Sequence, residues 1–272
     1  MPKVVLVTGG SSGIGEAIAR HLSSLPGYKV YATSRKAENG QVINGITFIK
    51  LDVTSTTSAT DAISWLHTTE GRIDVLINNA GIGFAGPLEH TTKDEINAVM
   101  NTNVYGILDL CRLVTPIMRA QGGGNILNVS SLAGRFGLPF RGVYSATKFA
   151  LEGLTESLSQ EVQQFGISVS LVEPGEFSTN ISENRQTTAL PEDSVYTAQF
   201  SLMYDLLNTE LTKALSPSIM GKAVEKILNT RKPKLRYVVS SPFQRLTLVL
   251  KAILPARVFE KLLMNHYKIP TL

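Results

Sequence analysis

An apolar run leads directly into a glycine-rich loop in Val4-Val-Leu-Val-Thr-Gly-Gly-Ser-Ser-Gly-Ile-Gly15. The run is typical of a buried strand, and the residues after the loop carry a helical pattern. Three glycines permit a tight turn, close approach of the backbone to a pyrophosphate, and close packing of helix on strand. The first N–H groups of the helix then face the phosphates, so the segment predicts a dinucleotide site. The residues expected to contact the dinucleotide are Gly9, Ser11, Ser12, Gly13, Ile14 and Gly15.

Strand-like and helical segments keep alternating after this first unit. Continuous apolar strands separated by helices are typical of a parallel sheet covered on both faces. We therefore predict an α/β fold with a Rossmann-type doubly wound parallel sheet, as a single domain over residues 1–272. The expected strands cover 4–7, 29–33, 46–51, 73–77, 125–129 and 168–172, and the expected helices cover 14–25, 59–67, 93–118 and 143–165.

The composition excludes several classes of protein. With 43% apolar and 18% charged residues, the chain can bury a core, which excludes a disordered or coiled-coil protein. The single cysteine, Cys111, excludes a disulfide framework and favours a reducing, cytoplasmic compartment. The four histidines lack metal-ligand spacing, so no metal site is expected. Without a secretory signal or an apolar run near the ~20 residues of a membrane span, we expect a soluble or peripheral protein.

Two segments depart from the alternation. Residues 176–216 are rich in Thr, Ser and Asn, which is typical of a substrate flap or, alternatively, of a surface excursion. Residues 242–264 predict an amphipathic helix with Phe243, Leu246, Leu250, Ile253 and Leu254 on one face. Such a helix can pack on the body, pair with another subunit, or lie in a bilayer interface.

Charge is distributed unevenly along the chain. Residues 231–272 carry nine Lys/Arg and one acidic residue, whereas the first 230 carry 17 basic and 21 acidic residues. A basic tail on a mildly acidic body indicates an anionic surface partner, and lipid headgroups at a membrane surface fit best. Nucleic acid is not an expected partner, because the basic stretch from Arg231 to Arg236 lacks interleaved aromatics and any recognised reading motif.

The end of the second expected strand distinguishes between two dinucleotides. An NAD site usually places a carboxylate here for the ribose 2′-hydroxyl, whereas the 2′-phosphate of NADP requires cationic partners. The segment Ala32-Thr-Ser-Arg-Lys36 contains no acid. Arg35 and Lys36 therefore favour NADP(H) over NAD(H), the alternative being that both are ordinary surface charges.

A tyrosine and a lysine form the candidate acid/base pair. In Tyr144-Ser-Ala-Thr-Lys148, the spacing of four residues puts both side chains on one helical face. An ammonium stabilises a nearby phenolate, so Lys148 is predicted to tune Tyr144 for proton exchange with a carbonyl or alcohol. A hydroxyl at the end of the fifth expected strand can hydrogen-bond the substrate oxygen, and the strand offers both Ser130 and Ser131.

With these residues the chain resembles the short-chain dehydrogenases/reductases over about residues 3 to 180. Leu51-Asp52-Val53 resembles the adenine-contacting Asp-Val of the family, and Asn78-Asn-Ala-Gly81 resembles its signature turn. Pro174-Gly175, with Thr179 beyond, is similar to the segment that closes over nicotinamide. The resemblance implies cofactor contacts from Asp52, Val53, Asn79, Ala80, Gly81, Tyr144, Lys148, Pro174, Gly175 and Thr179.

The resemblance also implies a catalytic set. A serine thirteen residues before the tyrosine matches the family and selects Ser131. Asn103, with Asn101 as its competitor, matches the helix asparagine that the family uses with water and lysine as a proton relay. In this scheme Tyr144 exchanges the proton, Ser131 orients the oxygen, and Lys148 holds the nicotinamide ribose.

Two further segments indicate which branch of the family the chain resembles. Lys29-Val-Tyr-Ala-Thr-Ser-Arg35 and Gly137-Leu-Pro-Phe140 resemble the branch of 17β-hydroxysteroid and retinol dehydrogenases. We expect an NADP(H)-dependent oxidoreductase that acts on a hydrophobic ketone, aldehyde or alcohol of steroid, retinoid or acyl-lipid type. One alternative is a 3-oxoacyl-carrier-protein reductase, which the long tail and flap disfavour. The other is a non-catalytic NADPH-binding sensor or scaffold, which the intact catalytic set disfavours. The family also implies a homo-oligomer, either a dimer or a tetramer.

Overall fold

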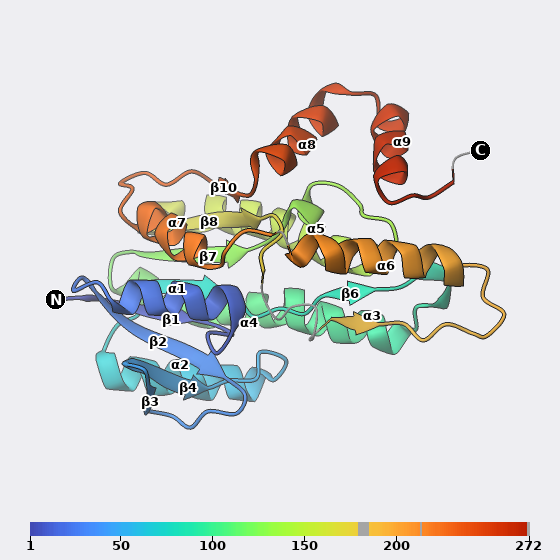
Figure 1. Ribbon diagram of the computed structural model, residues 1–272. Coiled ribbons are helices and arrows are strands. Elements are labelled where there is room, and N and C mark those ends of the chain that lie inside the picture. The colour runs from blue at the N-terminus through green and yellow to red at the C-terminus, as the bar shows by residue number, and fades with distance from the viewer. Residues whose placement is uncertain (179–184, 213, 271–272) are drawn as a thin grey trace.

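The computed structural model describes residues 1–178, 185–212 and 214–270. An eight-stranded sheet lies at the centre in the order β10-β8-β7-β5-β1-β2-β4-β3, with helices on both of its faces (Figure 1). Its strands pair in parallel, except that β3 pairs antiparallel with β4. The predicted doubly wound α/β fold is confirmed.

The strands of this sheet are β1 (Lys3–Val7), β2 (Tyr28–Ser34), β3 (Gln41–Ile43), β4 (Ile46–Lys50), β5 (Val75–Asn78), β7 (Gly124–Val129), β8 (Ile167–Pro174) and β10 (Arg236–Val239). A small second sheet contains β6 (Phe84–Ala85) and β9 (Gln186–Thr187). The helices are α1 (Gly13–Ser23), α2 (Thr56–Glu70), α3 (Lys93–Met100), α4 (Gly106–Ala120), α5 (Gly142–Val162), α6 (Thr197–Thr212), α7 (Ser218–Leu228), α8 (Pro242–Ile253) and α9 (Ala256–His266).

Successive side chains of β1 enter two separate cores, because strand residues alternate between the faces of a sheet. Val4 and Leu6 face the core that α2, α4 and α5 cover. Val5 and Val7 face the core that α1 and α7 cover. Both faces of the strand are therefore buried, which explains why the parallel strands appear in the sequence as continuous apolar runs.

The helix expected over residues 93–118 is one helical stretch over 93–120 with a π-helical turn inside it. α3 and α4 are separated by a π-helical turn at Asn101–Tyr105, which widens the backbone by one residue. α3 begins with a capping box in which Thr92 and Glu95 satisfy each other's N–H groups. The sequence predicts this long helix but not the π-helical turn, which contains the candidate relay residue Asn103.

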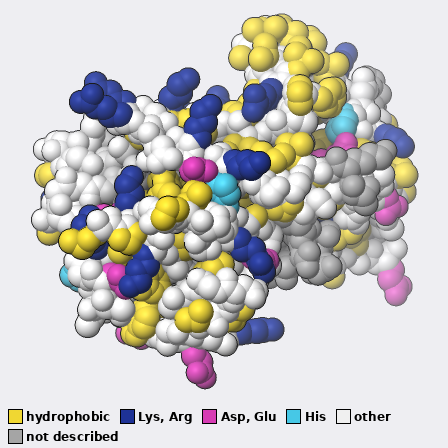
Figure 2. Space-filling view, turned by 60° about the vertical axis from the view of Figure 1, so that its left-hand side comes forward, with side chains coloured by type: hydrophobic (Ala, Val, Ile, Leu, Met, Phe, Trp, Pro, Cys, Tyr) yellow, Lys and Arg dark blue, Asp and Glu magenta, His cyan; other side chains and the backbone are white. Residues whose placement is uncertain are grey.

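The C-terminal segment forms two helices rather than the single helix expected over residues 242–264. α8 ends at Ile253 and α9 begins at Ala256, with Pro255 between them. Proline lacks the N–H that a continuing helix needs, so the chain turns there. The two helices project from the body as a hairpin (Figure 1), and apolar side chains gather on it (Figure 2). None of the described helices is both long and apolar enough to cross a membrane.

The predicted flap, residues 176–216, contains β9 and α6. β9 pairs with β6, where the Gln186 N–H donates to the Gly83 carbonyl at 3.0 Å and the Thr188 N–H donates to the Ala85 carbonyl at 3.2 Å. These bonds attach the flap to the chain that follows the Asn-Asn-Ala-Gly turn. Thr179, a predicted cofactor contact, lies outside the described residues.

Candidate active site

The glycine-rich loop follows β1 and begins α1, as the sequence predicts. Gly9 and Gly13 have positive φ angles of 62° and 58°, which L residues rarely adopt. A Cβ at Gly15 would lie 2.3 Å from the Gly9 carbonyl oxygen and 2.3 Å from Nδ2 of Asn79. Within the described contacts, Ser12 makes no side-chain cap to α1, so the first N–H groups of the helix remain for an anion. The backbone thus fits a bound pyrophosphate.

The Asn-Asn-Ala-Gly turn after β5 supports this loop. Thr8 Oγ1 accepts hydrogen bonds from the N–H groups of Asn79 at 2.9 Å and Ala80 at 3.0 Å. Asn79 Nδ2 donates in return to the Thr8 carbonyl at 2.9 Å. A Cβ at Gly81 would lie 3.2 Å from Oδ1 of Asn103. The turn therefore joins the glycine-rich loop to the predicted relay asparagine.

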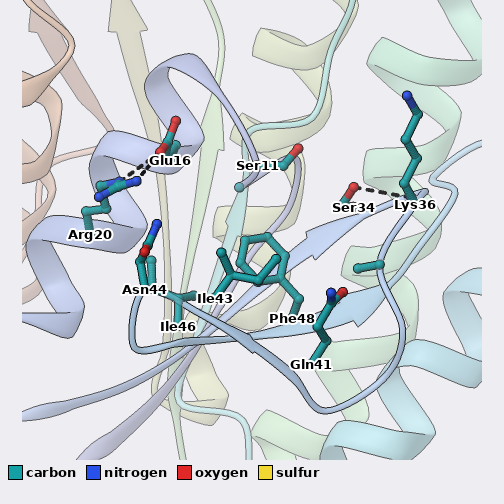
Figure 3. A pocket seen from close by; sticks show the side chains of 12 residues that line it. Ser11, Glu16, Arg20, Ser34, Lys36, Gln41, Ile43, Asn44, Ile46 and Phe48 are labelled. Carbon is teal, nitrogen blue, oxygen red and sulfur yellow. Dashed lines mark hydrogen bonds and ion pairs between the residues drawn. The ribbon is translucent and has the colours of Figure 1, made fainter.

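A pocket of about 240 Å³ opens beside the loop (Figure 3). Ser11 lines it from the loop, while Ser34 and Lys36 line it from the end of β2. The opposite wall is the β3–β4 hairpin, whose Asn44-Gly45 turn has positive φ at both residues. Glu16 and Arg20 of α1 also line the pocket and pair with each other at 2.7 Å, so the carboxylate is neutralised and the hydroxyl and ammonium groups remain as donors of the kind that a phosphate requires. The chemistry of this pocket therefore fits a phosphate group on the adenosine side of a dinucleotide.

Asp52 and Val53 lie in the loop after β4. The Asp52 carboxylate accepts hydrogen bonds from the Thr54 hydroxyl at 2.7 Å and the Thr54 N–H at 3.0 Å. These bonds, together with the charge of Arg35, hold the pKa of Asp52 below its usual range. A Cβ at Gly106 would lie 2.4 Å from the Val53 carbonyl oxygen, so the loop packs tightly on the start of α4. The structure therefore holds Asp52 ionised and fixed near Arg35.

Tyr144 and Lys148 lie one turn apart on α5 and are both buried, with 7% and 6% of their surface exposed. Lys148 Nζ lies 5.8 Å from the centre of the Tyr144 ring. It donates a 2.9 Å hydrogen bond to the Val129 carbonyl at the end of β7. An ammonium group has three donors, so others remain for a ribose hydroxyl. The pair therefore lies at the carboxyl edge of the sheet, where dinucleotides bind in this fold.

The two candidate serines point to different sides of the chain after β7. Ser130 is buried, and its Oγ would lie 2.9 Å from a Cβ at Gly134, so this hydroxyl faces into the protein. Ser131 is half-buried and caps the 3-10 turn Leu132–Gly134, with its Oγ accepting from the Ala133 N–H at 3.1 Å. Ala133 packs in one apolar cluster with Tyr144. Of the two serines, Ser131 is the one with surface left for a substrate.

Asn103 is fully buried in the π-helical turn, whereas its competitor Asn101 is exposed. Asn103 Oδ1 accepts a hydrogen bond from the Ile82 N–H, and Asn103 Nδ2 donates one to the Ile82 carbonyl, both at 2.9 Å. Nδ2 also lies 3.2 Å from Oγ1 of Thr147, between the tyrosine and the lysine on α5. The asparagine thus holds the chain after the Asn-Asn-Ala-Gly turn against the catalytic helix.

Pro174 and Gly175 end β8 beside the C-terminal hairpin. The Gly175 N–H donates to the Val239 carbonyl of β10 at 3.0 Å. A Cβ at Gly175 would lie 2.1 Å from Oε1 of Gln244, in the first turn of α8. The base of the hairpin therefore packs directly on the segment expected to close over nicotinamide.

A buried ion network lies behind the serine turn. Glu173 of β8 has no exposed side-chain surface and pairs with Arg135 at 3.1 Å and Arg236 at 3.3 Å. Burial, together with the neighbouring Glu152, raises the pKa of Glu173, and the two arginines oppose this shift. Arg236 also pairs with Glu152 at 2.9 Å and with Glu156. The network fixes β10 and the chain after Ser131 to α5.

A second charged cluster faces the ring of Tyr144. The Arg141 guanidinium carbon lies 5.0 Å from the ring centre. Glu176 lies in this cluster with Glu210 and His266, and His266 pairs with Glu210 at 3.1 Å. Burial and the neighbouring Glu210 raise the pKa of Glu176 to about 7. Contacts from the flap and from α9 therefore meet beside the catalytic helix.

The flap also contributes an apolar wall. Met203 and Leu207 of α6 are buried against Ala85 and Tyr267. Phe140 and Phe200 extend this cluster, with ring centres 5.8 Å apart. Aromatic and aliphatic groups of this kind favour an apolar ligand.

The cysteine and histidines considered in the sequence have no catalytic or metal-binding role in the described structure. Cys111 is buried beside Asn78 and Asn128, and burial raises the pKa of its thiol to about 12, which leaves it inert as a nucleophile. In the part of the chain that the structure describes, no group of His, Cys, Asp and Glu side chains could hold a metal ion.

Several site residues are absent from the sequence predictions. Thr8 supports the glycine-rich loop, and its place in the loop motif was the available signal. The hairpin residues Gln41 and Asn44 line the pocket, and the Asn44-Gly45 pair is a strong turn signal that could have identified the hairpin. Arg141 and Glu176 had no signal, because the groups that surround them come from distant parts of the chain.

Comparisons with known proteins agree with this geometry. The profile of the family described as short chain dehydrogenase matches residues 3–190. A protein of Bacteroides thetaiotaomicron named 3-ketodihydrosphingosine reductase is 38% identical, over 98% of this chain and 99% of its own length. Human 17-beta-hydroxysteroid dehydrogenase type 1 is 34% identical, over 88% of this chain and 78% of its own.

Solved structures show the same architecture. A short-chain dehydrogenase from Streptomyces avermitilis superposes with a TM-score of 0.81 at 31% identity, covering 99% of this chain and 97% of that one. A metagenomic short-chain oxidoreductase solved with NADP superposes with a TM-score of 0.68 at 28% identity, covering 87% of this chain and 96% of that one.

Proposed function

Because the chain belongs to the short-chain dehydrogenase/reductase family, whose members are oxidoreductases acting on CH–OH and C=O groups, we propose that it is an NADP(H)-dependent oxidoreductase of hydrophobic carbonyl compounds or alcohols. The observation that carries this proposal is the buried pair of Tyr144 and Lys148, 5.8 Å apart from ring centre to Nζ, at the carboxyl edge of the sheet. An intact pair of this kind is not needed by a scaffold that only binds a nucleotide.

Each residue has a defined task in the proposed reaction. When bound, the nicotinamide supplies or accepts the hydride. The Tyr144 hydroxyl gives its proton to the substrate oxygen in reduction and takes it back in oxidation. Ser131 orients that oxygen by a hydrogen bond. Lys148 stabilises the phenolate and holds the ribose, and Asn103 keeps the wall of the site against α5 at Thr147.

The apolar wall of the flap supports a hydrophobic substrate. Met203 and Leu207 are buried beneath this wall, and its half-buried members Phe140 and Phe200 offer an apolar surface without a hydrogen-bonding group that a small polar ketone could use. The names of the relatives point the same way, since a ketodihydrosphingosine has a long alkyl chain and a 17-beta-hydroxysteroid has a large apolar ring system. A long-chain or steroid-like carbonyl is therefore the proposed substrate class.

Turnover with a panel of carbonyl compounds tests the proposal. We expect kcat/KM for NADPH oxidation with 3-ketodihydrosphingosine or a 17-ketosteroid to exceed that with a short water-soluble ketone by about tenfold or more. Burial of a few additional methylene groups, at about 0.8 kcal/mol each, accounts for such a ratio. Turnover only on carrier-bound 3-oxoacyl groups would favour a 3-oxoacyl-carrier-protein reductase. Tight NADPH binding without turnover on any compound would favour a sensor or scaffold.

The proposed preference for NADP(H) rests on the cations after β2. Arg35 and Lys36 are exposed directly after β2, where the sequence has no carboxylate, and Lys36 lines the pocket together with Ser11 and Ser34. We expect the double variant R35A/K36A to raise the KM for NADPH about tenfold or more, since each removes a charge-assisted contact to the 2′-phosphate. The KM for NADH should change by less than about twofold.

The matched control for the cofactor variant is K222A, at an exposed lysine on α7. It removes a charge without approaching the pocket and should leave both KM values unchanged. Equal effects of R35A/K36A on NADPH and NADH would instead mean that the two cations do not read the 2′-phosphate.

The protein is also proposed to be a homo-oligomer in a reducing, cytoplasmic compartment. α4, α5 and the turn before α4 expose large apolar side chains at Tyr105, Leu108, Phe149 and Leu154, which suit contact with a second copy. The one cysteine is buried and unpaired, as a reducing compartment allows.

A further inference from the structure

The α8–α9 hairpin carries an exposed apolar surface that the proposed reaction does not use. Its six large side chains are between 45% and 69% exposed, and Figure 2 shows apolar groups gathered on the hairpin at the top of the molecule. A contiguous patch of this kind marks an interaction site more often than ordinary surface. We define the hairpin surface by Phe243, Leu246, Val249, Ile253, Val258 and Leu262.

The hairpin is already docked on the body by its other side. Leu250 and Leu254, which the sequence placed on the same helical face as Phe243, Leu246 and Ile253, pack near the buried Phe259. The Phe259 ring meets the Phe136 ring edge to face, with centres 5.4 Å apart. The inner side of the hairpin is therefore occupied, so the hairpin surface stays free for another partner.

Cations accompany the apolar groups. Lys251 Nζ lies 5.1 Å from the centre of the Phe259 ring, and Arg257 has a side chain that is 91% exposed. Arg245 and Lys261 are exposed on the same two helices. Glu260 is the single acid among residues 231–272, which carry nine basic residues. The rest of the chain has more acidic than basic residues, so the positive charge is specific to this end of the molecule.

We propose that the hairpin surface docks the protein on an anionic lipid bilayer. The apolar side chains would enter the boundary between headgroups and acyl chains, while the surrounding cations contact lipid phosphates. A second copy is a poorer occupant of this surface, because two hairpins with the same excess of positive charge repel each other. A bilayer supplies both the apolar medium and the opposite charge.

Docking in this orientation would bring the bilayer close to the active site. Gln244 at the base of α8 packs on Gly175, beside the predicted nicotinamide position. Leu132 and Phe136, which follow Ser131 in the chain, share an apolar cluster with Phe259. If the proposed function holds, an apolar carbonyl dissolved in the bilayer would have a short apolar route to the catalytic residues.

Vesicle flotation of the full chain tests the docking proposal. We expect the protein to float with vesicles of phosphatidylcholine and phosphatidylglycerol in equal parts, and about tenfold less with phosphatidylcholine alone. Binding should weaken as salt screens the charge. The variant F243Q/I253Q removes two of the most exposed apolar groups, at 69% and 68%, and should lower the bound-to-free ratio about tenfold or more.

The matched control is I96Q/I219Q, which removes two exposed apolar side chains, at 37% and 40%, from α3 and α7, outside both the hairpin surface and the proposed oligomer contact. It should float like the unchanged protein. Both variants should keep their thermal unfolding temperature and the turnover of a water-soluble carbonyl, so that failure of docking is separate from failure of the enzyme. The proposal would be overturned by equal flotation of F243Q/I253Q and the unchanged protein, or by no flotation at all. It would also be overturned if light scattering showed that F243Q/I253Q separates an oligomer while L108Q/F149Q, at the proposed oligomer contact on α4 and α5, does not.

Discussion

Replacing Tyr144 with phenylalanine should lower kcat/KM for NADPH-dependent carbonyl reduction by about 10²–10⁴-fold, the range that general acid catalysis supplies. The substitution removes the hydroxyl that donates the proton and leaves the ring in place. That ring packs with Phe84, Val99 and Ala133, and the guanidinium group of Arg141 lies over it. The loss should therefore appear in kcat, with NADPH affinity and the unfolding temperature nearly unchanged.

Y105F is the control for this experiment. Tyr105 precedes α4 and is 54% exposed, so loss of its hydroxyl should alter turnover by less than about twofold. Steady-state rates of NADPH oxidation at saturating cofactor distinguish the two variants. If Y144F kept more than about a third of the turnover, another group would have to donate the proton, and the proposed mechanism would fail.

Substituting Arg236 with methionine should destabilise the protein by about 3 kcal/mol or more. Methionine keeps an apolar stem of similar length, so the variant removes mainly the charge. Glu173, whose side chain has no exposed surface, would then share Arg135 alone with its acidic neighbours. Breaking a buried pair in this way leaves a carboxylate that neither water nor a cation fully compensates.

Arg112 offers the matched comparison for Arg236. It pairs with Asp109 on α4 at 3.4 Å, but its side chain is 60% exposed, so R112M should cost less than about 1 kcal/mol. Urea unfolding of both variants measures the two free energies. Similar losses in both would show that the network behind the serine turn contributes no more than a surface ion pair. If R236M loses more unfolding free energy than R112M, we also expect its kcat to fall. Arg135 belongs to the same ion network as Arg236 and directly follows the turn that Ser131 caps.

The sequence predicts the six parallel strands well because each is buried on both faces and therefore apolar throughout. β3 escapes prediction because its three residues are all exposed and form no apolar run. β10 escapes for an electrostatic reason. Its Arg236 belongs to a basic stretch in the sequence, and only the fold brings the carboxylates of Glu152, Glu156 and Glu173 around it. A local sequence pattern indicates whether a segment is buried. It does not show that a charged side chain will be paired with carboxylates from distant parts of the sequence.

The same distinction applies to the candidate site, where local spacing predicts some residues and only the fold brings the others together. Tyr144 and Lys148 are adjacent on one helix, so their spacing alone predicts that they lie together. Asn103 is identified by motif, but the π-helical turn that buries it depends on packing against α5, which no local pattern encodes. Glu176 and His266 are ninety residues apart and meet only because the hairpin returns α9 to the flap.

The widened turn at Asn101–Tyr105 has a geometric effect on everything that follows it. Each residue of a regular helix rotates the next by about 100°, so one extra residue swings the second half of the rod by roughly that angle. Before the turn, Val99 is buried in the same apolar cluster as Tyr144. After it, Leu110 and Val114 point under the sheet. A regular α-helix could place only one of these two sets of side chains correctly. Deleting a single residue here would therefore move either Val99 away from the Tyr144 cluster or Leu110 and Val114 out of the core.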